Sequence, residues 1–98
     1  MDLYVIRRSR AWSSPEELQE TAARSRRIGD EDMPNEVRWI RSYVVDEGDG
    51  MLGTMCVYEA VSPEAIREHA RRTGMPADEV IPVADTVIIR PDPEPAQA

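Results

Sequence analysis

Two residues with useful chemistry at neutral pH stand close together in the sequence. Cys56 is the only cysteine and His69 the only histidine, and both lie between Met55 and Glu79. Imidazole binds Ni²⁺ and Zn²⁺ and exchanges protons near neutral pH, and a thiolate is a soft-metal ligand and a nucleophile. Each also has a structural interpretation: the histidine bonds a backbone carbonyl or a tyrosine hydroxyl beneath a helix, and the cysteine is a small buried apolar side chain. Metal or proton-transfer chemistry would most easily be built in this stretch.

The pattern around these residues orients their side chains. The stretch is expected to be a strand followed by a helix, and in the strand Cys56 and Tyr58 share one face while Glu59 points to the other. Helical spacing after Ile66 turns His69 toward the sheet or its rim. We therefore predict His69, Cys56 and Glu59 as candidate metal ligands, with the remaining ligands of any site supplied by other carboxylates or by a second subunit.

Acid–base catalysis is the alternative use of the same region. His69 would be the acid or base, and Tyr58 or Tyr43 would orient a small organic substrate. Glu59 has a second interpretation too, as one half of an ion pair at an interface or beside a ligand. Its arginine partner would be Arg7, Arg38 or Arg41.

Composition limits the class of protein. The 98 residues are enough for one domain, and the net charge of -7 argues against nucleic acid as a partner. A single cysteine excludes an internal disulfide and a multi-cysteine zinc site. No apolar run is long enough to span a membrane, so a cytoplasmic location is expected. All twelve cations are arginines, and with nineteen carboxylates present most of them are expected in solvated ion pairs.

Both expected helices carry clear start and stop signals. Ser14 and Ser62 are predicted N-caps, each followed by a proline at the first helical position, and Glu17 completes a capping box. Gly29 and Gly74 are the predicted C-terminal stops. Strands are predicted at residues 1–9, 36–46, 52–60 and 81–90.

The order of these elements predicts the fold. Strand, helix, strand, strand, helix, strand is the βαββαβ order of the ferredoxin-like class: an α+β domain over residues 1–90, with a four-stranded antiparallel sheet and two helices on one face. The strands carry apolar residues on both faces, so the uncovered face needs a partner. We predict a homodimer that packs sheet on sheet in a dimeric α+β barrel arrangement. The acidic, Pro-rich tail 91–98 is predicted to be disordered.

Three runs, in order, make the chain similar to a known family. They are VRWIRSYVVD at 37–46, CVYEA at 56–60 and REHARRTGMPAD at 67–78. Together they resemble a family of small bacterial domains catalogued as of unknown function, whose members include so-called nickel-binding proteins. The resemblance covers residues 1–90. It implies a ferredoxin-like domain that dimerises through its sheet, and Ni²⁺ as a cofactor.

Three functions follow as hypotheses. The first is a dimeric domain that binds a small ligand or a metal ion, with nickel as the metal that the resemblance implies. The second is a dimeric α+β barrel enzyme, cyclase- or isomerase-like, acting on a small organic molecule. The third is an assembly module without a small-molecule site. The predicted partners are a second copy of the chain and a small molecule or metal ion, with no nucleic acid and no membrane.

Overall fold

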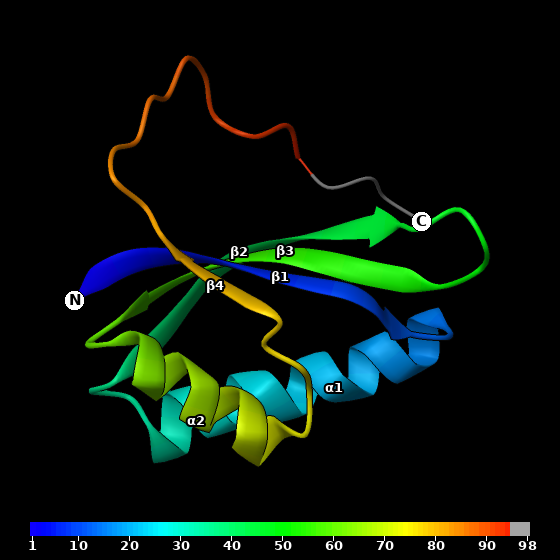
Figure 1. Ribbon diagram of the computed structural model, residues 1–98, viewed down its shortest axis with the longest axis horizontal. Helices are drawn as coiled ribbons and strands as arrows, with labels where there is room; N and C mark the ends of the chain where they lie inside the picture. Colours follow the sequence, from blue (N-terminus) through cyan, green and yellow to red (C-terminus); the bar gives the residue numbers. More distant parts are fainter. Residues whose placement is uncertain (95–98) are drawn as a thin grey trace.

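The computed structural model describes residues 1–94 and has the predicted order of elements. The elements are β1 Asp2–Trp12, α1 Pro15–Arg27, the π-helical turn η1 Ile28–Asp32, β2 Val37–Asp46, β3 Leu52–Ala60, α2 Pro63–Thr73 and β4 Glu79–Pro82. The strands form one antiparallel sheet in the order β2-β3-β1-β4. Both helices cover the same face of this sheet (Figure 1). The ferredoxin-like prediction is confirmed, while the dimeric arrangement stays a prediction.

The two serine N-caps act as predicted, whereas the Glu17 carboxylate of the predicted capping box accepts from the Ser13 hydroxyl at 2.7 Å. The Ser14 hydroxyl accepts a hydrogen bond from the Glu17 N–H at 3.2 Å, and the Ser62 hydroxyl accepts one from the Ala65 N–H at 3.1 Å. Gly74 ends α2 in the left-handed conformation, with φ of 84°. These local bonds fix where α1 and α2 begin against the sheet.

The predicted stop of the first helix at Gly29 is wrong. The chain continues from α1 into η1, where the Met33 N–H bonds the Ile28 carbonyl at 3.0 Å in the five-residue spacing of a π-helix. Ile28, Gly29 and Met33 are all buried by this extra turn. Burial of the two large apolar side chains therefore prevails over the glycine stop signal.

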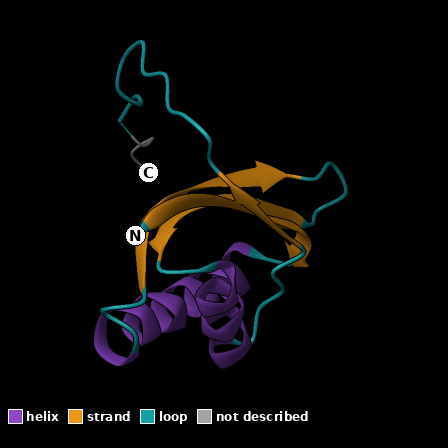
Figure 2. Cartoon of the chain, turned by 60° about the vertical axis from the view of Figure 1, so that its left-hand side comes forward, coloured by secondary structure: helices purple, strands orange, loops and turns teal. Residues whose placement is uncertain are grey.

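The core lies between the two helices and the face of the sheet that they cover, which we call the helix face. Its fully buried apolar residues include Ile6, Val37, Tyr58, Ala60 and Ile66. The other face, which we call the open face, carries half-exposed or exposed apolar residues, among them Leu3, Val5, Val57 and Ile81. Figure 2 shows the sheet curving over the helices, with its open face turned away from them. Within residues 1–94, no helix combines the length and the apolar character needed to cross a membrane.

A β-bulge in β2 changes which side chains share a face. Trp39 is opposite Tyr58 on β3 and Arg41 is opposite Val57, so Ile40 is an extra residue. Simple alternation along β2 would place Trp39 on the same face as Arg41 and Tyr43. The bulge instead returns Ser42, opposite Cys56, to the helix face with Trp39. It leaves Tyr43 on the open face.

The last strand is much shorter than predicted. β4 covers Glu79–Pro82 at the edge beside β1, in place of the expected 81–90. Its edge position fits Pro82, which has no N–H to donate to a further strand. Residues 83–94 then leave the sheet on the side opposite the helices (Figures 1 and 2). Residues 91–94 form no helix or strand, and the rest of the predicted disordered tail, residues 95–98, lies outside the described residues.

Candidate functional site

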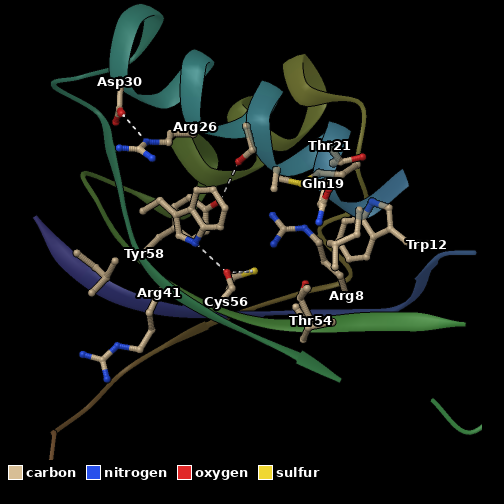
Figure 3. A pocket seen from close by; sticks show the side chains of 18 residues that line it. Arg8, Trp12, Gln19, Thr21, Arg26, Asp30, Arg41, Thr54, Cys56 and Tyr58 are labelled. Carbon is tan, nitrogen blue, oxygen red and sulfur yellow. Dashed lines mark hydrogen bonds and ion pairs between the residues drawn. The ribbon is translucent and has the colours of Figure 1, made fainter. Parts of the chain in front are cut away.

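A cavity of about 690 Å³ lies between α1 and the sheet, on the helix face. Its walls include Trp12, Trp39, Cys56 and Tyr58, so it is largely apolar and aromatic. Trp39 and Tyr58 stack with their ring centroids 6.1 Å apart and their planes within 5° of parallel. Figure 3 shows the lining side chains converging from the strands and from α1. A mostly apolar cavity with a few polar groups is the usual form of a small-molecule site.

A short chain of hydrogen bonds crosses one wall of this cavity. The Trp39 Nε1–H donates to the Ser42 hydroxyl at 2.7 Å, and that hydroxyl donates to the Cys56 Sγ at 2.9 Å. Both bonds exist because the β2 bulge places Trp39 and Ser42 on the same face as Cys56. Cys56 therefore lines this cavity, with its sulfur already accepting one hydrogen bond.

His69 is buried behind the cavity and does not line it. Its Nε2 lies 2.9 Å from the Ser25 carbonyl, which only accepts, so the ring proton is on Nε2. The Nδ1 atom has no hydrogen-bond partner among residues 1–94. Burial lowers the pKa of His69, and the nearby Arg8 charge lowers it further. The neutral ring is held beneath the helix by a backbone carbonyl, the first of the two structural roles that the sequence suggested.

Tyr58 connects His69 to the cavity. Its hydroxyl lies 3.2 Å from the Ser25 hydroxyl, and its ring centroid is 5.5 Å from that of His69. Burial raises the pKa of Tyr58 to about 12, so the phenol stays protonated at neutral pH. Ser25 and Tyr58 both line the cavity and both lie beside His69, so they stand between its ring and a bound molecule.

The other predicted site residues lie elsewhere. Glu59 is on the open face, opposite in direction to Cys56, and Tyr43 is an exposed residue of that face whose hydroxyl donates to Asp92. Glu68, on the outer side of α2, pairs with Arg71 and Arg72, which lower its pKa to about 2. The structure thus brings Cys56, Tyr58 and His69 to the helix face and separates them from Tyr43 and Glu59.

A nickel site does not fit the residues of one described chain. Residues 1–94 contain no group of three His, Cys, Asp or Glu side chains that could hold a metal ion. Of the three predicted ligands, Glu59 is on the other face of the sheet, and the protonated Nε2 of His69 is bound to the Ser25 carbonyl. His69, Cys56 and Glu59 are therefore not brought together within one chain.

Arg8 is the residue of this pocket that sequence reasoning missed. Its side chain is 0% exposed, and its Nε–H donates to the Pro76 carbonyl at 2.6 Å. Its Nη1 and Nη2 groups, like the Thr54 hydroxyl, find no hydrogen-bond partner in the described part of the chain. Most arginines were expected in solvated ion pairs; Arg7 and Arg41 form such pairs, and Arg8 is an exception. Its place in the alternation with Tyr4 and Ile6 is the signal that could have identified it.

Comparisons with known proteins agree with this architecture. A family model described as "Nickel responsive protein SCO4226-like" matches residues 4–83. The crystal structure of SCO4226 from Streptomyces coelicolor A3(2) superposes with a TM-score of 0.67 at 19% sequence identity. That match covers 87% of this chain and 99% of that chain, and at this identity it shows the fold alone. No curated protein matches the chain in sequence.

Proposed function

The chain belongs to the SCO4226-like family of nickel responsive proteins, and we propose that it is a small-molecule-binding domain whose site is the cavity between α1 and the sheet. The observation that carries this proposal is the cavity of about 690 Å³ walled by Trp12, Trp39 and Tyr58. Aromatic walls bind planar or aliphatic groups, and the polar groups among them give orientation. Acid–base catalysis is less well supported, because His69 does not line this cavity.

Binding of a neutral aromatic probe tests this proposal. We expect 2-naphthylmethanol to bind the protein in calorimetry, and to shift the NMR indole N–H signals of Trp12 and Trp39. Ala22→Phe, which places a ring into the cavity from α1, should abolish binding. Ala23→Phe, on an exposed position of the same helix, is the control and should leave binding unchanged. Binding that survives Ala22→Phe would contradict the choice of cavity.

We propose further that the partner of the open face is a second copy of this chain, in the cytoplasm. Ile40, Tyr43 and Ile81 are exposed large side chains, and Val87, Ile88 and Ile89 are between 74% and 81% exposed on the segment that leaves the sheet on this side. The Asp92 carboxylate ties this segment to β2 by accepting from Arg41 and Tyr43. An apolar surface of this extent favours association.

Sedimentation velocity separates a dimer from a monomer. We expect a dimer at micromolar concentration that Ile81→Asp dissociates, because the new charge would be buried between two sheets. Val61→Asp, at an exposed apolar residue between β3 and α2, is the matched control and should leave the dimer intact. A monomeric wild-type protein at these concentrations would contradict the proposal.

Nickel is the second candidate ligand, supported by the family description. Since the predicted ligands are not brought together in one chain, we propose that nickel would need donors from two copies, with Glu59 on the open face as one donor. Calorimetry with Ni²⁺ should then show binding that Glu59→Gln weakens and His69→Ala leaves intact. If the wild type does not bind Ni²⁺, nickel is excluded as a ligand of this protein. If His69→Ala abolishes Ni²⁺ binding and Glu59→Gln does not, the nickel site lies on the helix face.

A further inference from the structure

We infer that the inner end of the cavity is a carboxylate-binding subsite, in which the Arg8 guanidinium and the Thr54 hydroxyl hold the acid group of a small organic ligand. The inference rests on the proposed function, because it names the class of molecule that the cavity would take. Arg8 and Thr54 are direct partners in the β1–β3 register, so both side chains leave the sheet on the same face and side by side. Figure 3 shows both beside the cavity.

The polar groups of this subsite are buried without partners. Arg8 is 0% exposed and Thr54 is 3% exposed, yet Nη1, Nη2 and the Thr54 hydroxyl make no hydrogen bond within residues 1–94. A buried charge without an opposite charge costs several kcal/mol, far more than one misplaced surface group. The Nε bond to Pro76 fixes the guanidinium in place and leaves its outer N–H groups free to bind a ligand.

Within residues 1–94, no carboxylate neutralises this cation from inside the cavity. Asp30 is the carboxylate among the lining residues, and it lies 3.6 Å from Arg26 near the far end of α1. Figure 3 shows that pair on the opposite side of the cavity from Arg8. The neighbouring arginine of β1 does have a carboxylate partner. Arg7 Nη2 donates to both carboxylate oxygens of Glu47, each at 3.1 Å. An anion from outside the chain is the group that Arg8 lacks.

The number of donors favours a carboxylate over a phosphate. Two Nη groups of one guanidinium form the fork that matches the two oxygens of a carboxylate, and one positive charge balances one negative charge. The Thr54 hydroxyl supplies one additional donor. A phosphate dianion would keep an unbalanced charge here, because the other arginines of the cavity wall already have partners, Arg26 in Asp30 and Arg41 in Asp92.

The other lining residues of the cavity indicate what the rest of the ligand would be. Beyond the subsite, the lining side chains include Trp12, Leu18, Trp39 and Val44, which favour a planar or aliphatic group. Gln19, an exposed residue of α1, also lines this cavity. The ligand class is therefore a monocarboxylate with one apolar body, such as an aryl or medium-length alkyl acid.

A matched pair of probes tests this subsite. Calorimetry compares 2-naphthoate with the neutral 2-naphthylmethanol on the wild type, on Arg8→Met and on the control Arg7→Met, which changes the adjacent arginine of the open face. We expect the wild type and Arg7→Met to bind the acid roughly ten- to hundredfold more tightly than the alcohol. In Arg8→Met this preference should disappear while the alcohol still binds. Arg8→Lys keeps the charge without the fork and should keep a reduced preference, which gives a second test where Arg8→Met does not fold.

The outcomes separate this inference from the proposed function. Equal binding of acid and alcohol to the wild type would leave a small-molecule cavity and overturn the carboxylate subsite. If neither naphthyl probe binds, the proposed function is contradicted. The carboxylate subsite is then tested separately with acetate. Acetate at constant ionic strength should raise the Tm of the wild type and of Arg7→Met but not that of Arg8→Met. The same rise in all three, or in none, would overturn the inference.

Discussion

Two neighbouring arginines of β1 have opposite environments on the two faces of the sheet. Arg7 points to the open face, where it reaches Glu47 and is partly exposed. Arg8 points to the helix face, where it is fully buried and two of its nitrogen groups have no partner among the described residues. One residue step along β1 thus separates a structural ion pair from an unbalanced charge. This difference is the basis of our proposal that the helix face carries the binding site.

The largest effect should come from the apolar neighbours of these two arginines. Ile6→Ala removes a fully buried side chain of the helix face and should lower the free energy of unfolding by about 2–5 kcal/mol. Val5→Ala, on the open face, should cost roughly 1 kcal/mol or less, because Val5 is already half-exposed. Urea unfolding at low protein concentration measures both. Equal costs would mean that the open face is covered as tightly as the helix face.

The arginines themselves should give effects of opposite sign. Without ligand, Arg8→Met should raise the free energy of unfolding by about 1–3 kcal/mol, because it removes a buried unpaired charge and adds apolar burial. Arg7→Met should lower it by about 1 kcal/mol or less, because it removes a partly exposed ion pair. Thermal unfolding in a carboxylate-free buffer gives the comparison. Destabilisation by Arg8→Met as large as that of a broken buried ion pair would show that the guanidinium has a partner in the free protein.

A tyrosine on each face extends the comparison to neutral groups. Tyr58→Phe removes the buried hydroxyl that lies 3.2 Å from the Ser25 hydroxyl and should cost about 0.5–1.5 kcal/mol. Tyr43→Phe removes an exposed hydroxyl that donates to Asp92 and should change stability by less than about 0.5 kcal/mol. The same unfolding series measures both variants. A larger cost for Tyr43→Phe would give the open face the more important polar contact.

The smallest expected effect is the contribution of His69 to the pH dependence of the free energy of unfolding. Burial lowers its pKa in the folded protein, so the unfolded chain binds the proton more readily. The groups that face the ring are Arg8 from β1, Tyr58 from β3 and the Ser25 carbonyl at the end of α1. Stability from this histidine should be fully present above pH about 6.5 and decline as the pH falls toward the folded pKa.

Unfolding measured across this pH range checks the sign. The wild type should lose stability as the pH falls below about 6.5, and His69→Gln should lose most of that slope. Because the chain has one histidine, the difference between the two curves belongs to His69. Stability that rises on acidification would place an unseen acidic partner beside the ring.

Features that depend on bonds between nearby residues could be predicted from the sequence. Features that depend on the packing of the whole core could not. Ser14, Ser62 and Gly74 act through bonds within a few residues, so the helix ends that they define were predictable. Gly29 was misread because the stop signal competes with burial of Ile28, which depends on the whole core. The bulge at Ile40 depends on how β2 pairs with β3, and it decides that Ser42 and not Tyr43 joins the cavity wall.

The candidate site was predicted in part for the same reason. The alternation in β3 correctly grouped Cys56 with Tyr58, and the helical spacing correctly turned His69 toward them. The alternation of β1 also puts Arg8 on the face of Tyr4 and Ile6, but it does not show that the guanidinium is buried. That burial depends on α1 above the guanidinium and on the Pro76 carbonyl 68 residues away in sequence. An arginine near the end of a strand is ordinarily solvated, and only the tertiary packing removes this one from water.

The most direct test of the functional difference between the two faces is a crystal structure of the protein grown with 2-naphthoate. We predict that its carboxylate will lie within hydrogen-bond distance of the Arg8 Nη atoms and the Thr54 hydroxyl, with the naphthyl ring between Trp12 and Trp39. The Arg7–Glu47 pair should be unchanged. A naphthoate bound only at the open face, or an Arg8 guanidinium paired with a carboxylate of the protein itself, would contradict the account.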